Sequence, residues 1–379
     1  MIDVYRTGAA TAPCSPRASA IRKWGSGQYM IDIDETLSSR GLPDSFEDYL
    51  GRYADVAGEA INAYIPQASH PDMDAFLYGP LTEYSRNGGK RHRPLICFAA
   101  ARAVGGQANR AVSVAAAIEH FHTAALIHDD IADDAELRRG EPCLHLTEGL
   151  GLSINMGDLG LTLVNGTVVK DPLLDAETKV RVISELIDMT RRTIEGQALD
   201  IGWARDGRYD LTVDDYLVMA THKTAHYSGA VPLALGAIVG GGTDAEVEGL
   251  RNFGLDTGLA FQIQDDILNL VGATESTQKG FRDDITEGKR TLVVVHALQN
   301  SRPDTRDRLV DILSSRTKDQ AVLNEAVELM KAAGSIEFAR NYAESLTGMA
   351  KIRLADALAP SAYRDLLISM ADFFVHRLK

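Results

Sequence analysis

The sequence predicts an all-α protein, and three observations support this fold class. Apolar residues recur with a helical period from Pro43 to the C-terminus. Breaks rich in glycine, such as Gly105-Gly106 and Gly240-Gly241-Gly242, separate the periodic segments. No convincing run of residues alternates with the period of a strand. We therefore expect one bundle of long helices that forms a single domain over residues 41–379.

The predicted helices follow one another closely along this domain. Ser45 and Asp48 have the spacing of a capping box, which predicts a helix from there to about residue 64. Further helices are expected near residues 72–86, 92–104, 108–131, 152–169, 176–199, 212–223, 226–239, 244–271, 287–299, 304–314, 318–333, 335–356 and 360–378.

Residues 1–40 are predicted to be a mostly disordered tail. They are rich in Ala, Ser, Gly and Thr, and they lack a helical period. Their first thirty residues carry Arg6, Arg17, Arg22 and Lys23 against only one acidic residue, Asp3. This bias leaves an organelle transit peptide as an alternative to an untargeted tail or an early start ahead of Met30.

Composition excludes several classes of function. The chain has 379 residues, a formal net charge of −14, 45% hydrophobic residues and 24% charged residues. The negative charge argues against non-specific binding of nucleic acid or of an anionic membrane. No apolar run is long enough to span a bilayer, so no membrane insertion is expected. The three cysteines lack a metal-binding spacing, which indicates a reducing compartment such as the cytoplasm.

A first acidic motif lies at the end of the predicted helix over 108–131. Asp129 and Asp133 are one helical turn apart with Asp130 beside them, an arrangement that repulsion makes unfavourable for stability alone. Carboxylate oxygens are ligands of Mg²⁺, which also accepts phosphate oxygens. Arg138 and Arg139 follow, and guanidinium groups suit the same phosphates. The stretch alone leaves open a magnesium diphosphate site or a solvated acidic helix end.

A basic turn precedes the predicted helix over 92–104. Gly88 and Gly89 permit close approach of the backbone to a ligand, and basic residues next to a helix N-terminus suit a phosphate. The basic residues of the turn are Lys90, Arg91 and Arg93. For this segment alone, a solvated basic loop is the favoured alternative.

A second acidic motif repeats the pattern of the first. Asp265 and Asp266 follow an apolar helical run, and Asn269 lies one turn beyond Asp265. If the two motifs face each other across the bundle, they would enclose a metal-bound diphosphate. The loop after the second motif carries Lys279, Asp284 and Lys289, which could close over the same anion.

These motifs occur with further short matches in a fixed order. The matches are Gly88-Gly89-Lys90 with Arg93-Pro94, Asp129-Asp130 with Asp133 and Arg138-Arg139-Gly140, Met156-Gly157-Asp158, Gly196-Gln197 with Asp200, Lys223-Thr224, Phe261-Gln262 with Asp265-Asp266, and Asp284 with Lys289. The sequence thereby resembles the trans-polyprenyl diphosphate synthases, the head-to-tail isoprenoid chain elongases, from about residue 45 onward.

The resemblance implies an isoprenoid synthase fold with helices around a deep central cavity, and a homodimer. It implies that isopentenyl diphosphate is joined to an allylic diphosphate. The implied ligands of three Mg²⁺ ions are Asp129, Asp130, Asp133 and Asp265, with Asp266 in support. The implied contacts to the allylic diphosphate are Arg138, Lys223, Thr224, Gln262 and Lys279. The implied contacts to isopentenyl diphosphate are Lys90, Arg93, His122 and Arg139. Asn269 departs from the third aspartate found in many members of the family.

Product length is inferred from the helix upstream of Asp129. By resemblance, Ala124 and Ala125 occupy positions where short-chain members often carry aromatic residues, so the path for the product should extend beyond C15. Phe121, one turn earlier, is the candidate floor of that path. We expect a C20 product, geranylgeranyl diphosphate, with farnesyl diphosphate or products of C25 and longer as alternatives.

Two other classes of function are compatible with parts of this pattern. A class I terpene cyclase shares the fold and the first motif, but it carries an Asn/Asp-Ser-Glu motif where this chain has Asp265-Asp266. A non-catalytic subunit of a hetero-oligomeric synthase tends to lose its aspartates, which this chain keeps. Both are less well supported than a chain elongase.

Overall fold

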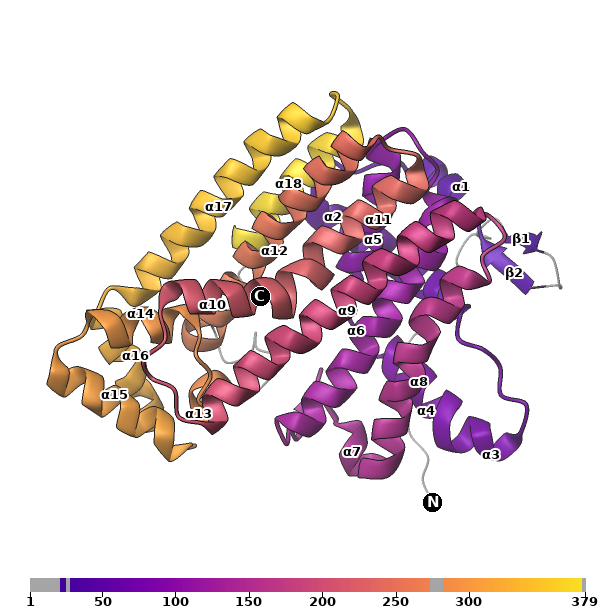
Figure 1. Cartoon of the computed structure of the whole chain (residues 1–379). Coiled ribbons are helices and arrows are strands. Elements are labelled where there is room, and N and C mark those ends of the chain that lie inside the picture. The colour runs from indigo at the N-terminus through magenta and orange to yellow at the C-terminus, as the bar shows by residue number, and fades with distance from the viewer. Residues whose placement is uncertain (1–20, 25–27, 273–281, 377–379) are drawn as a thin grey trace, which may run out of the picture.

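The structure is a computed structural model that describes residues 21–24, 28–272 and 282–376, and it confirms the all-α prediction (Figure 1). Two short antiparallel hairpins are the strands that these residues form. One hairpin pairs β1 (Ile21–Trp24) with β2 (Gln28–Ile31), and the other pairs β3 (Leu137–Arg138) with β4 (Glu141–Pro142). The helical elements around them account for the architecture.

The helical elements have the following bounds in chain order. They are α1 (Ile33–Arg40), α2 (Phe46–Asn62), α3 (Pro71–Met73), the π-helix η1 (Asp74–Tyr78), α4 (Gly79–Arg86), α5 (His92–Ala103), the 3₁₀ helix η2 (Ala108–Ala111), α6 (Val112–Ala132), α7 (Leu144–Thr147), α8 (Leu150–Val169), α9 (Ala176–Arg205), α10 (Val213–Ala220), the π-helix η3 (Thr221–Ala230), α11 (Val231–Gly240), α12 (Asp244–Val271), α13 (Asp283–Thr286), α14 (Leu292–Asn300), α15 (Pro303–Ser315), α16 (Gln320–Ala332), α17 (Ser335–Ala357) and α18 (Ala362–His376).

Local capping explains where several helices begin. Thr212 and Asp215 form a capping box at the start of α10, and Thr243 with Glu246 does the same for α12. Ser45 accepts a hydrogen bond from the backbone N–H of Asp48, which confirms the predicted start of α2. These side chains satisfy backbone groups that would otherwise lack a partner at each helix N-terminus.

The prediction of a mostly disordered tail is wrong for α1 and for the hairpin before it. Asp32 caps α1, and Ile33 and Leu37 are buried in the core. Asp34 accepts hydrogen bonds from Arg102 and from the backbone N–H groups of Ala108 and Asn109, at 3.3, 3.0 and 2.9 Å. Because these partners lie far along the chain, the local sequence does not reveal them. The remainder of the tail lies outside the described residues.

The two helices predicted over 212–223 and 226–239 are one continuous helical path, α10–η3–α11. The π-helical turns of η3 replace the expected break, and they rotate the following side chains relative to an α-helix. Small residues let η3 lie against α12. A Cβ atom on Gly229 would be 2.1 Å from the carbonyl oxygen of Gly254, so the two backbones are in direct contact.

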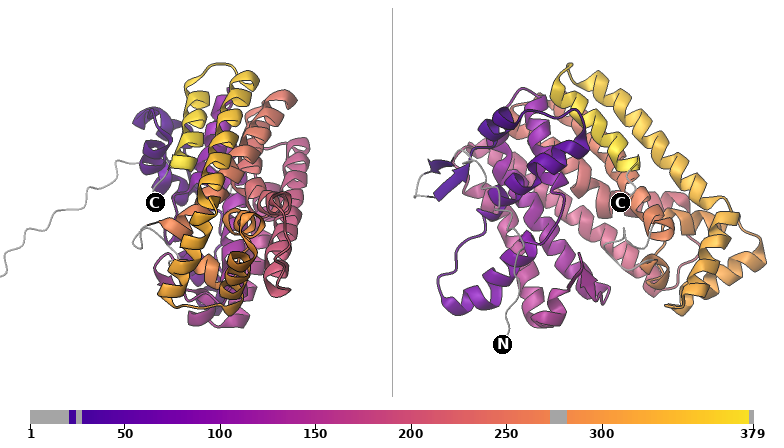
Figure 2. Two further views of the ribbon diagram at one scale, coloured as in Figure 1. Left: turned by 90° about the vertical axis from the view of Figure 1, so that its left-hand side faces the viewer. Right: turned by 180° about the vertical axis from the view of Figure 1, so that it is seen from behind.

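Two large hydrophobic cores lie within the bundle. One involves α2, α5, α6, α11 and α18, the other involves α10 and α14 to α16, and α12 and α17 contribute to both. Helix α6 packs against α8, α5 against α11, and α12 against α17 (Figures 1 and 2). The first acidic motif therefore lies on a helix of one core, and the second lies on a helix that joins the two cores. Within the described residues, the helices lack the combination of length and apolar character that spanning a membrane requires.

Candidate active site

The first acidic motif occupies the last turns of α6, and its three aspartates differ in environment. Asp130 is 1% exposed, and both of its oxygens have partners: Arg138 Nε lies 2.7 Å from Oδ1 and the Tyr84 hydroxyl 3.0 Å from Oδ2. Asp129 Oδ1 accepts a hydrogen bond from Gln197 Nε2 of α9 at 2.9 Å. Asp129 and Asp133 are more accessible than Asp130. The motif therefore has a buried anchor and two carboxylates available to a ligand.

The two adjacent arginines point to different partners. Arg138 pairs with Asp129 and Asp130, whereas Arg139 Nη1 donates to the carbonyl oxygens of Asn87 and Gly88, at 2.6 and 3.3 Å. Gly88 adopts a positive φ of 70°, and a Cβ atom there would lie 3.2 Å from Arg139 Cδ. The arginine pair therefore attaches the basic turn to the first acidic motif. The sequence pattern had predicted the turn and the motif as two separate phosphate sites.

Two of the four residues expected to contact isopentenyl diphosphate, Arg93 and His122, lie beside Tyr227 of η3, whereas Lys90 Nζ lies 5.6 Å from the centre of the Phe373 ring. The Arg93 guanidinium lies 4.6 Å from the centre of the Tyr227 ring and donates to Ser228 Oγ at 2.8 Å, while His122 stacks on the same ring. Burial and the neighbouring Arg93 hold the pKa of His122 well below its usual range, so this imidazole is neutral. Arg93 Nε and His122 Nδ1 are buried without a hydrogen-bond partner among the described residues. Such unsatisfied groups favour a polar ligand here.

In the second acidic motif, on α12, the second aspartate is buried, as it is in the first motif. Asp266 is 5% exposed and accepts hydrogen bonds from the Tyr216 hydroxyl at 2.8 Å and from Gln262 Nε2 at 2.7 Å. Burial and the Asp284 carboxylate raise the pKa of Asp266, while these two donors favour its ionised form. Thr224 in turn donates to Gln262 Oε1 at 2.7 Å. The departure from the family pattern, Asn269, accepts a hydrogen bond from the backbone N–H of Asp284 at 3.3 Å.

Lysine side chains pair with carboxylates next to the two motifs. Lys289 Nζ lies 3.4 Å from Asp133 Oδ2 and 3.6 Å from Asp284 Oδ1, so it bridges the end of α6 and the segment after the second motif. Lys223 forms an ion pair with the buried Asp200 of α9. Burial opposes charge on Lys223, but the carboxylates of Asp200 and Asp129 raise its pKa, so it stays protonated. Lys279, predicted to join this group, lies outside the described residues.

The residues expected to set product length lie on one side of α6 but have different neighbours. Phe121 is buried and packs edge-to-face on Tyr227, with ring centres 5.7 Å apart. Ala124 is buried against α8, where a Cβ atom on Gly160 would lie 3.0 Å from the Ala124 Cβ atom. Ala125 is partly buried at the edge of the core. Among the three, Ala124 leaves no room for a larger side chain unless α8 moves.

Several contacts of the site have no counterpart in the sequence-based prediction. Gln197 and Asp200 were part of a matched motif without an assigned role, and their spacing puts both on the inner face of α9. Gly196 beside them signals the close approach of α9 to η3. Tyr84 and Tyr216, which bind the buried aspartates, carry no local signal that would have identified them.

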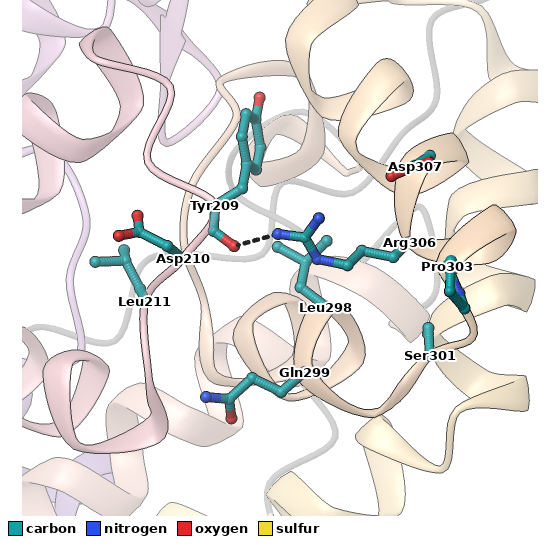
Figure 3. Close-up of a pocket in the computed structure, with 9 residues that line it drawn as sticks. All are labelled: Tyr209, Asp210, Leu211, Leu298, Gln299, Ser301, Pro303, Arg306 and Asp307. Atoms are coloured by element: carbon teal, nitrogen blue, oxygen red, sulfur yellow. Dashed lines mark hydrogen bonds between the residues drawn. The ribbon is translucent and has the colours of Figure 1, made fainter.

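The donor set fits a hard divalent cation only together with a bound anion. Among residues 21–24, 28–272 and 282–376, no three Asp, Glu, His or Cys side chains form a metal site by themselves. The accessible carboxylates are those of Asp129, Asp133 and Asp265, and hard oxygen donors of this kind suit Mg²⁺ when phosphate oxygens complete its coordination. A cavity of about 440 Å³ between the loop before α10 and the start of α15 contains none of the predicted site residues (Figure 3).

The fold and these ion pairs define a helical protein with a candidate site for an anionic ligand. The model of the polyprenyl synthetase family matches residues 74–330, and the chain belongs to this family. It is 38% identical over 330 residues to the short chain isoprenyl diphosphate synthase of Methanothermobacter thermautotrophicus, covering 87% of this chain and 98% of that protein. It is 34% identical over 354 residues to the geranylfarnesyl diphosphate synthase of Natronomonas pharaonis, covering 88% and 98%.

Solved structures show the same fold. Geranylgeranyl pyrophosphate synthetase from Pyrococcus horikoshii has a TM-score of 0.80 at 31% identity, covering 88% of this chain and 99% of that chain. Polyprenyl synthase from Caulobacter crescentus, complexed with calcium and isoprenyl diphosphate, has 0.78 at 31%, covering 89% and 100%. Geranylgeranyl pyrophosphate synthase from Corynebacterium glutamicum, complexed with isoprenyl diphosphate and magnesium, has 0.76 at 28%, covering 92% and 100%. The chain is therefore an enzyme of prenyl transfer, a trans-prenyltransferase.

The contact between α9 and η3 can be tested at Gly196. A Cβ atom there would lie 2.2 Å from the backbone nitrogen of Lys223, so Gly196→Ala should separate the helices and displace Gln197 and Asp200. We expect a loss of about 1–3 kcal/mol in the free energy of unfolding, measured by chemical denaturation, together with reduced prenyl transfer.

Gly202→Ala is the matched control, because no described atom lies within 4 Å of a Cβ atom on this residue of the same helix. Alanine should stabilise the helix there by about 0.5–1 kcal/mol. Equal stability of the two variants would contradict the close contact at Gly196.

Proposed function

We propose that this enzyme condenses isopentenyl diphosphate with an allylic diphosphate of C5 to C15 and releases an all-trans product, geranylgeranyl diphosphate. The observation that supports this proposal is that Arg138 and Arg139 bind different partners. One arginine belongs to the acidic motif and the other to the basic turn, so two anion sites lie side by side. Two neighbouring diphosphates are what head-to-tail condensation requires.

The allylic diphosphate is assigned to the acidic side. Asp129, Asp133 and Asp265 would hold Mg²⁺, for which we propose three ions per site, and the magnesium-containing Corynebacterium glutamicum structure supports this choice of metal. Bound there, the metal supplies Lewis-acid charge to the leaving diphosphate. Lys223 and Lys289 add fixed positive charge. We assign the buried Asp130 to support, because Arg138 and Tyr84 already engage both of its oxygens.

Isopentenyl diphosphate is assigned to the basic side. Arg93 and His122 present buried, unsatisfied nitrogen atoms. Lys90 lies on the turn before α5, and Arg139 is hydrogen-bonded to that turn. A diphosphate held here would receive donors from α5, α6 and the turn after α4. The two substrates would therefore be held in different ways. Metal ions bound by carboxylates would hold the allylic diphosphate, and basic side chains would contact isopentenyl diphosphate directly.

The residues of this chain support the chemistry by charge and by exclusion of water. The allylic C–O bond breaks, its electron pair leaves with the diphosphate, and the isopentenyl double bond attacks the allylic carbon. Loss of a proton to the released diphosphate forms the new double bond. Fixed cationic side chains stabilise the charge that develops on the leaving oxygen atoms. Apolar side chains around α6 and α12 keep water from the allylic cation.

Prenyl transfer can be measured directly. Incubation with Mg²⁺, labelled isopentenyl diphosphate and, in turn, C5, C10 and C15 allylic diphosphates should give elongated products. Asp129→Asn should lower the rate by about a hundredfold or more, because it weakens binding of the Mg²⁺ that supplies positive charge to the leaving diphosphate. Asp304→Asn, on the exposed first turn of α15, should leave the rate unchanged. No incorporation of isopentenyl diphosphate by the unaltered enzyme with any primer would contradict the proposed function.

Product length can be tested on α6. Phe121→Ala should lengthen the products, because it removes the ring that packs on Tyr227 at the expected floor. Ala125→Phe should shorten them by filling the path nearer Asp129. Sizing of extracted products by chromatography reads out both effects. Because Ala124 packs against Gly160, Ala124→Phe should cost stability as well as length. An unchanged product profile in Phe121→Ala and Ala125→Phe would refute the floor assignment.

We also propose that the enzyme is a homodimer that associates through α9. Val180, Ile187, Ile194 and Ile201 recur every seventh residue and are 66%, 55%, 59% and 43% exposed. Such a stripe on a long helix suits packing against the same helix of a second copy. The same helix carries Gln197 and the buried Asp200, so association would brace the helix that contacts Asp129.

Charges on this stripe should separate the subunits. The double variant Ile187→Glu/Ile194→Glu should sediment as a monomer, because two carboxylates per subunit would have to be buried at the interface. Ile352→Glu, at an isoleucine of α17 that is 66% exposed, should remain dimeric in the same analytical ultracentrifugation experiment. A monomeric unaltered enzyme at micromolar concentration would contradict this interface.

A further inference from the structure

Each acidic motif is held by a tyrosine that comes from a different helix. The Tyr84 hydroxyl of α4 donates to Asp130 Oδ2 at 3.0 Å, and the Tyr216 hydroxyl of α10 donates to Asp266 Oδ2 at 2.8 Å. In both cases the aspartate is the second of its motif and is buried. In both cases another side chain, Arg138 or Gln262, holds the remaining oxygen.

The arrangement occurs twice with similar spacing along the chain. Tyr84 precedes Asp130 by 46 residues, and Tyr216 precedes Asp266 by 50. Burial raises the pKa of both phenols, so each remains a hydrogen-bond donor over the working pH range. Two helix pairs in different parts of the bundle thus show the same contact, which a purely local packing requirement would not explain.

Each tyrosine also precedes a cationic element of the site. Tyr84 lies near the end of α4, six residues before Lys90 of the basic turn. Tyr216 lies two helical turns before Lys223 on the continuous path from α10 into η3. A phenol that binds the carboxylate therefore fixes the distance between an acidic motif and a neighbouring cationic element of the site.

We propose that Tyr84 and Tyr216 are positioning residues that set each acidic motif against its cationic partner. The inference rests on the proposed function, since it takes the motifs to hold metal-bound diphosphate. Neither hydroxyl touches the ligand. Each acts through the buried aspartate: it fixes the rotation of the motif, so that Asp129 with Asp133, and Asp265 on α12, face the shared anion.

The test removes one hydroxyl at a time. Tyr84→Phe and Tyr216→Phe are compared with Tyr53→Phe, whose buried hydroxyl donates to the carbonyl oxygen of Gly41 at 2.6 Å in another part of the bundle. Thermal unfolding is followed while Mg²⁺ is titrated in the presence of excess inorganic diphosphate. The rise in melting temperature reports binding without any catalytic turnover.

We expect Tyr84→Phe and Tyr216→Phe each to raise the half-saturating Mg²⁺ concentration by roughly tenfold to a hundredfold. Tyr53→Phe should lower the melting temperature without ligand and leave this concentration unchanged. Tyr216→Phe should also leave the KM for isopentenyl diphosphate within about twofold, because the basic turn is attached through Tyr84 and Arg139.

The proposal is overturned if both variants have the same half-saturating Mg²⁺ concentration as the unaltered enzyme, whatever their melting temperatures without ligand. A change of the same size in Tyr53→Phe would overturn it too, because the effect would then be general destabilisation. The unaltered enzyme is assayed for prenyl transfer in parallel. Failure of that assay counts against the proposed function, whereas normal transfer with unshifted variants counts against the positioning role alone.

Discussion

Mutual repulsion among carboxylates is the constraint around which this molecule is arranged. The Asp284 carboxylate raises the pKa of Asp266, and Lys289 interacts electrostatically with Asp284 as well as with Asp129 and Asp133. Partly buried like charges are costly unless cations lie among them. Lys289, Arg138 and Lys223 supply those cations, and each comes from a different part of the chain. The same contacts therefore neutralise the acidic motifs and join helices that are remote in the sequence.

Close helix contacts make these ion pairs possible. Lys223 reaches Asp200 because α9 approaches η3 at Gly196, where the backbone of η3 takes the space that a Cβ atom would need. The backbones are equally close where Gly229 of η3 lies against Gly254 of α12. The π-helical geometry of η3 then presents Thr224 to Gln262 and Tyr227 to Arg93. Small residues fix the spacing of the backbones, and the polar residues use the geometry that results.

The sequence was sufficient for most of the helices, and it singled out the acidic motifs as a candidate site. Periodicity located most helices within a few residues, because amphipathic burial is a local signal, and the acidic motifs stood out because clustered charge opposes stability. The different roles predicted for Arg138 and Arg139 came from the family resemblance. The local pattern did not distinguish Asp130 from Asp129, since adjacent residues differ only by the direction that tertiary packing gives them. Helix α1 and the tyrosine contacts were missed for the same reason: Asp34 and Tyr84 find their partners far along the chain.

Tyr227 links the two properties that the sequence pattern treats as separate, substrate binding and product length. Its ring packs against Phe121, stacks with His122 and lies beneath the Arg93 guanidinium. A change at the expected floor of the product path would therefore also alter the support of the isopentenyl diphosphate site. Ala124, by contrast, faces α8 across Gly160 and is separated from that group. The positions before the first acidic motif are thus not equivalent, and their effect on product length depends on which neighbouring helix each one meets.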